Sequence, residues 1–188
     1  MRLIDTETMG MVLHMGEDLP AYAILSHTWG PDEPLFRDMA DLPTAKQKLG
    51  FAKITAACNQ ALEDGLPYLW VDTVCIDKTS SAELSEAINS MFNWYKLSKV
   101  CYALLEDVSC EGEEEALVEQ LRSARWFTRG WTLQELLAPR VVNFYSKEWL
   151  LFGTKKSLSL EISKVTGIDK ATLTDLPLSR LSVARRSM

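Results

Sequence analysis

The residues best suited to carry chemistry lie in one segment, residues 125–139, with the sequence RWFTRGWTLQELLAP. On a helix that turns by about 100° per residue, the three leucines fall within one arc, whereas Trp131 and Glu135 fall together on the opposite side. The leucines would therefore face a core, and nothing in the local pattern buries the indole or the carboxylate. An aromatic ring beside a single carboxylate indicates a ligand cleft.

The same spacing also fits a purely structural interpretation. Thr132 and Glu135 match a capping box, in which the hydroxyl caps the start of the helix and the carboxylate reaches back to the threonine amide. Trp131 and Leu136 would then form the accompanying hydrophobic staple. The residues of this segment leave both interpretations open.

Composition narrows the function classes. The 188 residues suffice for one domain with a core and a short extension, and 47% apolar with 24% charged residues is typical of a soluble globular protein. A net charge of −6 argues against a nucleic-acid-binding protein, which needs a basic face. No apolar run approaches the roughly 20 residues of a membrane helix, and the N-terminus lacks a signal-peptide core. We therefore expect a cytoplasmic protein without a membrane span.

The cysteines and histidines predict no metal site. The four cysteines are far apart and form no C-x-x-C pair, so free thiols in a reducing compartment are expected, most of them buried. The two histidines, His14 and His27, are too few to complete a zinc site with them.

Apolar runs and helical stripes alternate along the chain. Strands are predicted at residues 22–25, 68–76, 100–105 and 141–145, and helices at 45–64, 80–95 and 122–138. Ser80 and Glu83 fit a capping box at the start of the second helix. Continuously apolar strands separated by helices predict an α/β three-layer sandwich, with a mostly parallel, flavodoxin-like central sheet.

Polar residues follow the predicted strands. In open parallel sheets, ligands bind beyond the carboxyl ends of the strands. This rule brings the loop from Ser26 to Gly30, the region around Asp72 and the segment leading to Glu135 to one edge. Neither a G-x-G-x-x-G nor a Walker motif is present, so the usual dinucleotide and phosphate loops are absent.

The periodic pattern weakens towards the C-terminal end. Residues 155–166 indicate one more helix, and residues 173–188 carry a proline, several serines and the basic end ARRSM. No helix stop signal closes this stretch. We expect the natural protein to continue beyond it.

Three segments together resemble the heterokaryon-incompatibility (HET) domain of filamentous fungi. They are AYAILSHTWG at 21–30, YLWVDTVCIDK with AELSEAINSMFNWY across 68–95, and ARWFTRGWTLQELLAP at 124–139. They occur in the family's order and with its usual spacing. The resemblance implies a HET domain over residues 1–150, followed by an extension over 151–188. It is closest to fungal NLR-like incompatibility proteins, where nucleotide-binding oligomerisation and repeat domains follow the HET domain.

The HET family is also regarded as a distant relative of TIR domains, whose sheet is flavodoxin-like. The TIR pattern begins with a strand ending in a Ser-aromatic pair, which resembles Ser26-His27 here, and continues with a strand ending in Asp, which resembles Asp72. An Ala-Ile pair follows, as at residues 87–88. A Trp-Cys-x-x-Glu-Leu motif then supplies the catalytic Glu, and residues 131–136 match it except that Thr132 replaces Cys.

The resemblance implies a programmed-cell-death effector of incompatibility and innate immunity. In its enzymatic form, the domain cleaves the nicotinamide–ribose bond of NAD when it self-associates, with Glu135 as the catalytic carboxylate and NAD as a substrate rather than a cofactor. Nicotinamide is a good leaving group, so one carboxylate that stabilises an oxocarbenium-like state suffices. Residues expected to contact the substrate are Ser26, His27, Trp29, Gly30, Asp72, Arg125, Arg129 and Trp131, with the tryptophans stacking on rings and the arginines meeting the pyrophosphate. The alternative is a non-enzymatic adaptor that recruits partners through its surface.

Overall fold

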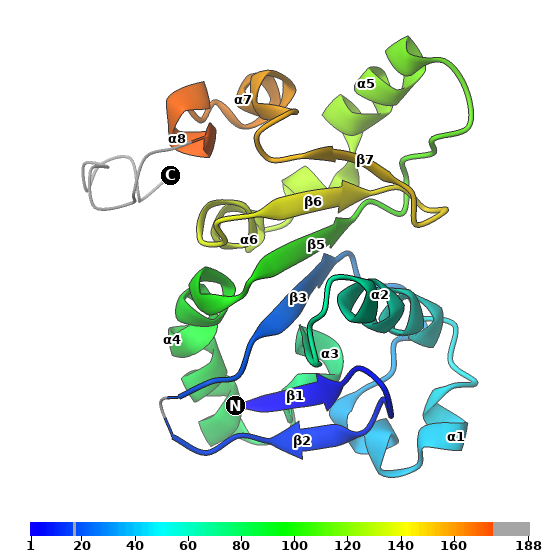
Figure 1. Ribbon diagram of the computed structural model, residues 1–188, viewed down its shortest axis with the longest axis vertical. Coiled ribbons are helices and arrows are strands. Elements are labelled where there is room, and N and C mark those ends of the chain that lie inside the picture. Colours follow the sequence, from blue (N-terminus) through cyan, green and yellow to red (C-terminus); the bar gives the residue numbers. More distant parts are fainter. Residues whose placement is uncertain (17, 175–188) are drawn as a thin grey trace.

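A single mixed sheet runs through the computed structural model, which describes residues 1–16 and 18–174. The described residues form a seven-stranded sheet in the order β2-β1-β4-β3-β5-β6-β7 (Figure 1). The strands are β1 (Arg2–Asp5), β2 (Met11–Leu13), β3 (Tyr22–His27), β4 (Tyr68–Val71), β5 (Val100–Leu104), β6 (Val142–Tyr145) and β7 (Leu151–Thr154).

The centre of the sheet is parallel. Strands β4, β3, β5 and β6 pair in parallel, whereas β1, β2 and β7 extend the two edges by antiparallel pairing. Numbered along the chain, the parallel strands follow the order 2-1-3-4, which is the start of the flavodoxin-like order. The predicted α/β class with a mostly parallel central sheet is confirmed.

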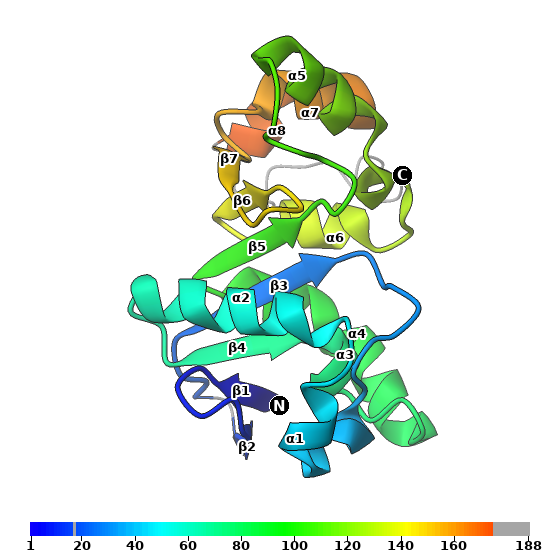
Figure 2. The ribbon, with the colours of Figure 1, turned by 90° about the vertical axis from the view of Figure 1, so that its right-hand side faces the viewer.

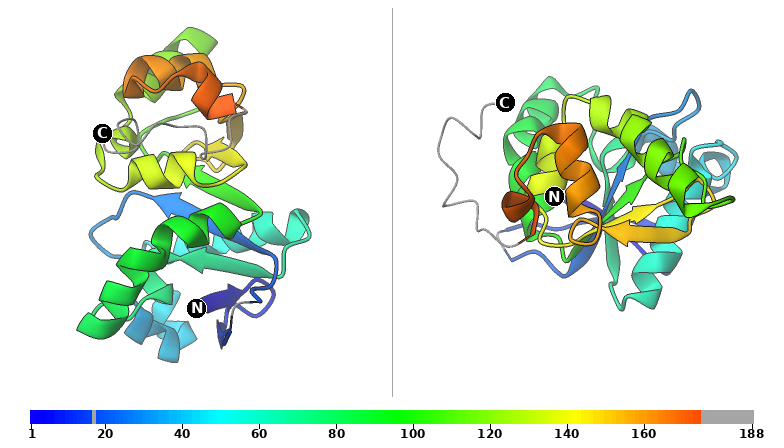
Figure 3. Two further views of the ribbon diagram at one scale, coloured as in Figure 1. Left: turned by 90° about the vertical axis from the view of Figure 1, so that its left-hand side faces the viewer. Right: turned by 90° about the horizontal axis from the view of Figure 1, so that it is seen from above.

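Helices cover both faces of the sheet. The helix α2 lies over β3 and β4 on one face, and α4 and α6 lie on the opposite face (Figures 2 and 3). Helices α5, α7 and α8 pack together beside the β6–β7 edge. The helices and 3-10 turns are η1 (Phe36–Ala40), α1 (Leu42–Ala45), α2 (Phe51–Glu63), α3 (Asp72–Cys75), α4 (Ser81–Leu97), α5 (Glu114–Ser123), η2 (Arg125–Thr128), α6 (Thr132–Leu137), α7 (Ser159–Thr166) and α8 (Lys170–Thr174).

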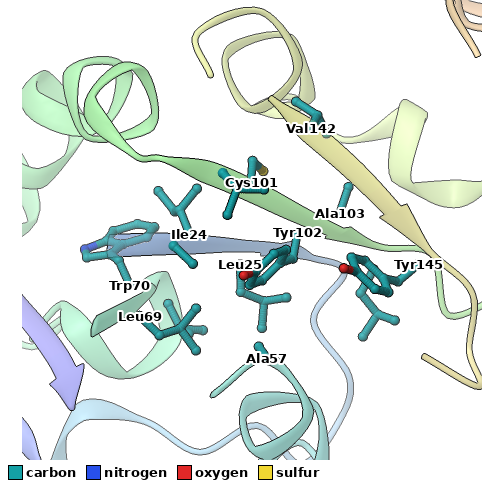
Figure 4. Close-up of a cluster of buried hydrophobic side chains, with 14 of the residues drawn as sticks. Ile24, Leu25, Ala57, Leu69, Trp70, Cys101, Tyr102, Ala103, Val142 and Tyr145 are labelled. Carbon is teal, nitrogen blue, oxygen red and sulfur yellow. The ribbon is translucent and has the colours of Figure 1, made fainter. Parts of the chain in front are cut away.

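The core lies on both faces of the parallel strands. Side chains of partnered residues in a parallel register share one face, so Ile24, Trp70 and Cys101 form one layer, while Leu25 and Tyr102 form the other. All five are fully buried (Figure 4). Because both faces are covered, these strands are continuously apolar, which is why they were predictable from the sequence.

The predicted strand at residues 68–76 is shorter than expected. It ends at Val71, and Asp72–Cys75 form the helical turn α3. The backbone N–H of Val71 donates to Cys75 Sγ at 3.4 Å, and the Asp72 carboxylate turns back towards β3. Inside a continuous buried strand this carboxylate would lack hydrogen-bond partners, whereas the turn brings it within reach of His27.

The predicted helix at residues 45–64 is divided. The helix α2 begins only at Phe51, because the backbone N–H groups of Leu49 and Gly50 donate to Asp32 rather than to a helical partner. At the next helix, the hydroxyl of Ser80 accepts from the backbone N–H of Glu83, as predicted. The Glu83 carboxylate instead accepts from the backbone of Asp77, so only half of that capping box forms.

The cysteines are free thiols, as expected. Cys58, Cys75 and Cys101 are buried, and burial raises the pKa of Cys58 and of Cys75 to about 12. These thiols are therefore neutral and poor nucleophiles. In the described ranges, no helix is both long and apolar enough to cross a bilayer, and no group of three or more His, Cys, Asp or Glu is arranged to hold a metal ion. The predicted basic end at residues 175–188 lies outside the described residues.

Candidate functional site

Glu135 lies at the centre of a buried polar network. Its carboxylate is carried by α6, and the residue is only 3% exposed. The guanidinium of Arg129 donates to both carboxylate oxygens, at 2.8 and 3.1 Å, and the hydroxyl of Ser26 donates to Oε2 at 2.5 Å. A paired, bidentate geometry of this kind compensates a buried carboxylate for its lost hydration.

The sheet and the 3-10 turn before α6 position this network. Ser26 lies near the carboxyl end of β3 and is 1% exposed, and its hydroxyl oxygen also accepts from Trp126 Nε1 at 2.7 Å. The Trp126 ring is fully buried and meets Phe127 and Phe144 edge-on. Aromatic packing therefore fixes the indole N–H that orients Ser26, which in turn orients Glu135.

The capping-box interpretation of Glu135 is wrong. The hydroxyl of Thr132 donates to the carbonyl of Trp126 at 2.5 Å, and α6 begins after Trp131 without a side-chain cap. Trp131 is 40% exposed, whereas Glu135 is buried. The expected pairing of an exposed indole with an exposed carboxylate is therefore also wrong, because Ser26 and Arg129 draw the carboxylate inwards.

A second polar cluster surrounds Asp72. His27 Nε2 lies 3.2 Å from Asp72 Oδ1, and the indole N–H of Trp29 donates to Oδ2 at 3.1 Å. Lys78 Nζ lies 3.5 Å from Oδ2 and 3.6 Å from the centre of the Trp29 ring, a cation–π contact. Burial alone would raise the pKa of Asp72, but the His27 hydrogen bond and the nearby cations outweigh it, so the pKa lies below its usual range.

The charges of the Glu135 network and of the Asp72 cluster shift the pKa values of the same neighbouring groups. The charge of Arg129, which binds Glu135, also contributes to the lowered pKa of Asp72. Glu135 and Asp72 both add to the effect of burial in raising the pKa of Tyr95. The carboxyl ends of β3 and β4 thus carry a continuous charged edge, as the parallel sheet predicted.

A cleft of about 590 Å³ opens at the same end of the sheet. Its walls come from the loop after β3, the first turns of α2, the end of β5 and the turn at residues 147–149. Three of the predicted contact residues line it, namely Trp29, Gly30 and Arg125. The structure therefore divides the predicted set between this cleft, the Glu135 network and the Asp72 cluster. Trp29 belongs to both the cleft and the Asp72 cluster, whereas Trp131 is exposed and belongs to none of the three.

A buried ion-pair network in the cleft wall was not predicted. Lys53 Nζ lies 2.5 Å from Glu33 Oε1 and 3.1 Å from Glu106 Oε1, and it donates to the carbonyl of Thr28. Glu33 also accepts from the backbone N–H of Gly30 at 2.6 Å. A lysine among the apolar positions of α2 was the only local signal, because its two acidic partners are distant in sequence.

Replacing Gly50 by alanine is expected to lower the free energy of unfolding by about 2 kcal/mol. The new Cβ would lie 2.5 Å from Glu33 Oε2 and 3.0 Å from Pro34 Cδ. Glu33 cannot withdraw easily, because Lys53 and the Gly30 amide hold its other oxygen. Urea denaturation measures the change. Gly130→Ala is the matched control, since its Cβ would meet no described atom within 4 Å, and equal costs for both variants would contradict the expectation.

Lys155 caps the C-terminal end of α6, the helix that carries Glu135. Its ammonium donates to the carbonyls of Leu136 and Pro139, at 3.1 and 2.6 Å, and satisfies the last turn of α6. Burial lowers the pKa of Lys155 to about 8. The folded protein therefore loses this proton at a lower pH than the unfolded chain, in which the lysine pKa is about 10.4.

This difference predicts how Lys155 alters stability with pH. Between pH 8 and about 10.4 the unfolded chain binds more protons at Lys155, so this residue makes stability rise with pH, by about 3 kcal/mol in total. We expect the stability of the parent relative to Lys155→Met to increase by this amount over that range, as measured by urea denaturation. The buried thiols of Cys58 and Cys75 have raised pKa values and therefore make stability fall as pH rises. They are present in both proteins, so their contribution cancels in the difference. A constant difference across the range would contradict the prediction.

Comparison with known proteins decides the family. The profile of the family described as "Heterokaryon incompatibility protein (HET)" matches residues 22–117, from β3 into α5. The chain belongs to the HET family. It is also 45% identical, over 197 aligned residues and 99% of its length, to the vegetative incompatibility protein HET-E-1 of Podospora anserina.

The matches differ in what they cover. The chain spans 14% of the length of HET-E-1, which is a much longer protein. The family profile covers Ser26 and Asp72 but ends before Glu135, whereas the match to HET-E-1 extends over nearly the whole HET chain. No solved structure matches the chain significantly.

Proposed function

We propose that this HET domain is an effector of incompatibility cell death, and that it cleaves the nicotinamide–ribose bond of NAD when several copies associate. Family membership and the 45% identity to a vegetative incompatibility protein support the role in incompatibility. The residues that would sense the trigger belong, in this proposal, to further domains of a longer chain, such as nucleotide-binding oligomerisation and repeat domains.

The observation that carries the enzymatic proposal is the placement of Glu135. Its carboxylate lies beside Ser26 at the carboxyl edge of the parallel sheet, where open α/β folds bind ligands. The resemblance of residues 131–136 to the catalytic segment of TIR domains and the 2-1-3-4 strand order support the same assignment.

The chemistry requires one carboxylate near the ribosyl carbon. The C1′–N bond breaks, and its electron pair leaves with neutral nicotinamide. Glu135 stabilises the oxocarbenium-like state that remains and takes the proton of the attacking water, giving ADP-ribose. The Asp72 cluster contributes Trp29, whose ring is 49% exposed and available for stacking.

The described arrangement is a closed form of this site. Glu135 is 3% exposed and both of its oxygens are occupied, so a substrate cannot reach it without displacing Arg129. The Arg129 side chain is 21% exposed and can turn outwards to a pyrophosphate. Association of several copies would favour that exchange, so the isolated monomer is expected to be nearly inactive.

The adaptor function is the second candidate, and the burial of Glu135 favours it. A carboxylate that only holds Arg129 and Ser26 in place would be structural. Trp131 and Trp29, 40% and 49% exposed, would then serve as contacts for a partner.

Consumption of NAD by the purified domain, dilute and artificially clustered, tests the proposal. Chromatography should detect nicotinamide and ADP-ribose in equal amounts, and only from the clustered protein. Folded, clustered protein that leaves NAD intact would overturn the enzymatic proposal and support the adaptor.

A further inference from the structure

The cleft beyond β3 and β5 lies where an open parallel sheet favours ligands. In the order 2-1-3-4, these two neighbouring strands run parallel, but their onward connections pass through α2 on one face of the sheet and α6 on the other. The loops that follow the two strands therefore separate and open a crevice. The volume of about 590 Å³ is within the usual range for a site that holds a small organic molecule. Glu135, Ser26 and Arg129 do not line it.

Two tryptophan side chains line the cleft, and their indole rings favour a ligand that carries a flat ring. Trp29 is half exposed beside the cleft, and Trp149 stacks on Tyr145 with ring centres 4.8 Å apart. The backbone of Trp149 has a φ of +59°, a conformation that bulky residues rarely adopt. Its indole N–H has no hydrogen-bond partner within the described part of the chain. Its backbone closes the turn between β6 and β7, and its ring packs against the core, so the indole is held in a fixed place in the cleft wall.

The deeper wall supplies acceptors for hydroxyl groups. The side chain of Glu106 is 33% exposed, and within residues 1–16 and 18–174 its carboxylate is bound at Oε1 alone, by Lys53. Its remaining lone pairs are suited to the adjacent hydroxyls of a ribose. The Lys53–Glu33 pair behind it fixes its position and reduces the local negative charge.

The rim supplies cations for a single phosphate. Arg125 and Lys147 are 65% and 53% exposed, and among the described residues each pairs with a single carboxylate, at 3.3 and 3.6 Å. Four carboxylates and three cations line the cleft as a whole. Negative charge is therefore in slight excess over the whole cleft, which disfavours a chain of three phosphates, and a single phosphate is favoured only at the rim, where the two exposed cations lie.

We propose that this cleft binds a nucleoside monophosphate, at a site separate from the Glu135 network. The base stacks on the indoles, the ribose hydroxyls donate to Glu106, and the phosphate meets Arg125 and Lys147. The inference does not depend on NAD cleavage. Because Trp29 also donates to Asp72, an occupied cleft would hold that cluster in its described geometry.

Isothermal titration calorimetry of the whole domain with adenosine, AMP, ATP and inorganic phosphate tests the site. AMP should bind most tightly, adenosine about tenfold more weakly, and phosphate alone not measurably, since two exposed charge-assisted contacts together contribute about a factor of ten. Arg125→Ala combined with Lys147→Ala should reduce the affinity for AMP to that for adenosine and leave adenosine unchanged. Both substitutions are at exposed positions, so folding should be unaffected.

A cleft-filling variant separates this site from any other. Ala56 lines the cleft from α2, so Ala56→Phe should abolish binding of AMP and adenosine alike, whereas Asn59→Phe, exposed on the same helix, should leave it intact. Absence of AMP binding to the parent at millimolar concentration would overturn the proposal. So would AMP binding that survives Ala56→Phe, or that is lost in Glu135→Gln, which would locate the ligand in the Glu135 network. Loss of NAD cleavage alone would leave the proposal standing.

Discussion

Replacing Glu135 by glutamine is expected to reduce NAD cleavage by the clustered domain at least about 100-fold while the domain stays folded. Glutamine has the same shape and can still accept from Ser26, but it lacks the charge that stabilises an oxocarbenium-like state. Arg129 loses its counter-charge, yet its side chain is 21% exposed and keeps access to water. The initial rate of nicotinamide release gives the activity, and circular dichroism verifies the fold.

The control for this variant is Glu86→Gln. Glu86 is exposed on α4, away from both clusters, so the same loss of charge should leave the rate unchanged. An equal fall in both variants would indicate a general effect of charge on clustering. A Glu135→Gln protein that retained full activity would remove the carboxylate from the mechanism.

Replacing Arg129 by alanine is expected to lower the free energy of unfolding at pH 7 by about 4 kcal/mol. The substitution leaves Glu135 as a carboxylate that is 3% exposed, with only the hydroxyl of Ser26 to compensate it. Removing one partner of a buried pair costs more than the pair contributes, because the remaining charge has lost both its hydration and its counter-ion. Urea denaturation at pH 7 measures the change.

A second substitution tests this explanation. Adding Glu135→Gln to Arg129→Ala should recover most of the lost stability, because a buried amide costs far less than an unpaired carboxylate. Arg125→Ala is the comparison for an exposed pair, and its cost should be below about 1 kcal/mol. If Arg129→Ala cost no more than Arg125→Ala, the Glu135 pair would be weak and the closed form of the site would need little to open.

The central architecture was predictable from local patterns. Strands β3, β5 and β6 are continuously apolar because both sheet faces are covered, and this pattern is visible in the sequence. The start of α4 after Ser80 is equally local, because a helix N-cap depends on residues three positions apart. The antiparallel strands β1, β2 and β7 were missed, since they are short and only partly buried.

Local sequence patterns were sufficient to predict that polar residues converge at one edge of the sheet. Ser26 follows one predicted strand, Asp72 interrupts the next, and Glu135 belongs to the helix before the last parallel strand. The parallel arrangement brings all three to the same end of the sheet. The family could also be recognised from the spacing of its segments, and the comparison with known HET proteins confirmed it.

The contacts that each of these residues makes depend on the three-dimensional fold. A helical pattern places Glu135 on the outer side of α6, but Ser26, 109 positions earlier in the chain, draws it into the core together with Arg129. The same holds for Lys53, whose partner Glu106 is 53 positions away. Hydrogen bonds and ion pairs act over a few ångströms in space, whereas periodicity describes neighbours along the chain. Burial of a charged group therefore depends on partners that no local pattern can contain.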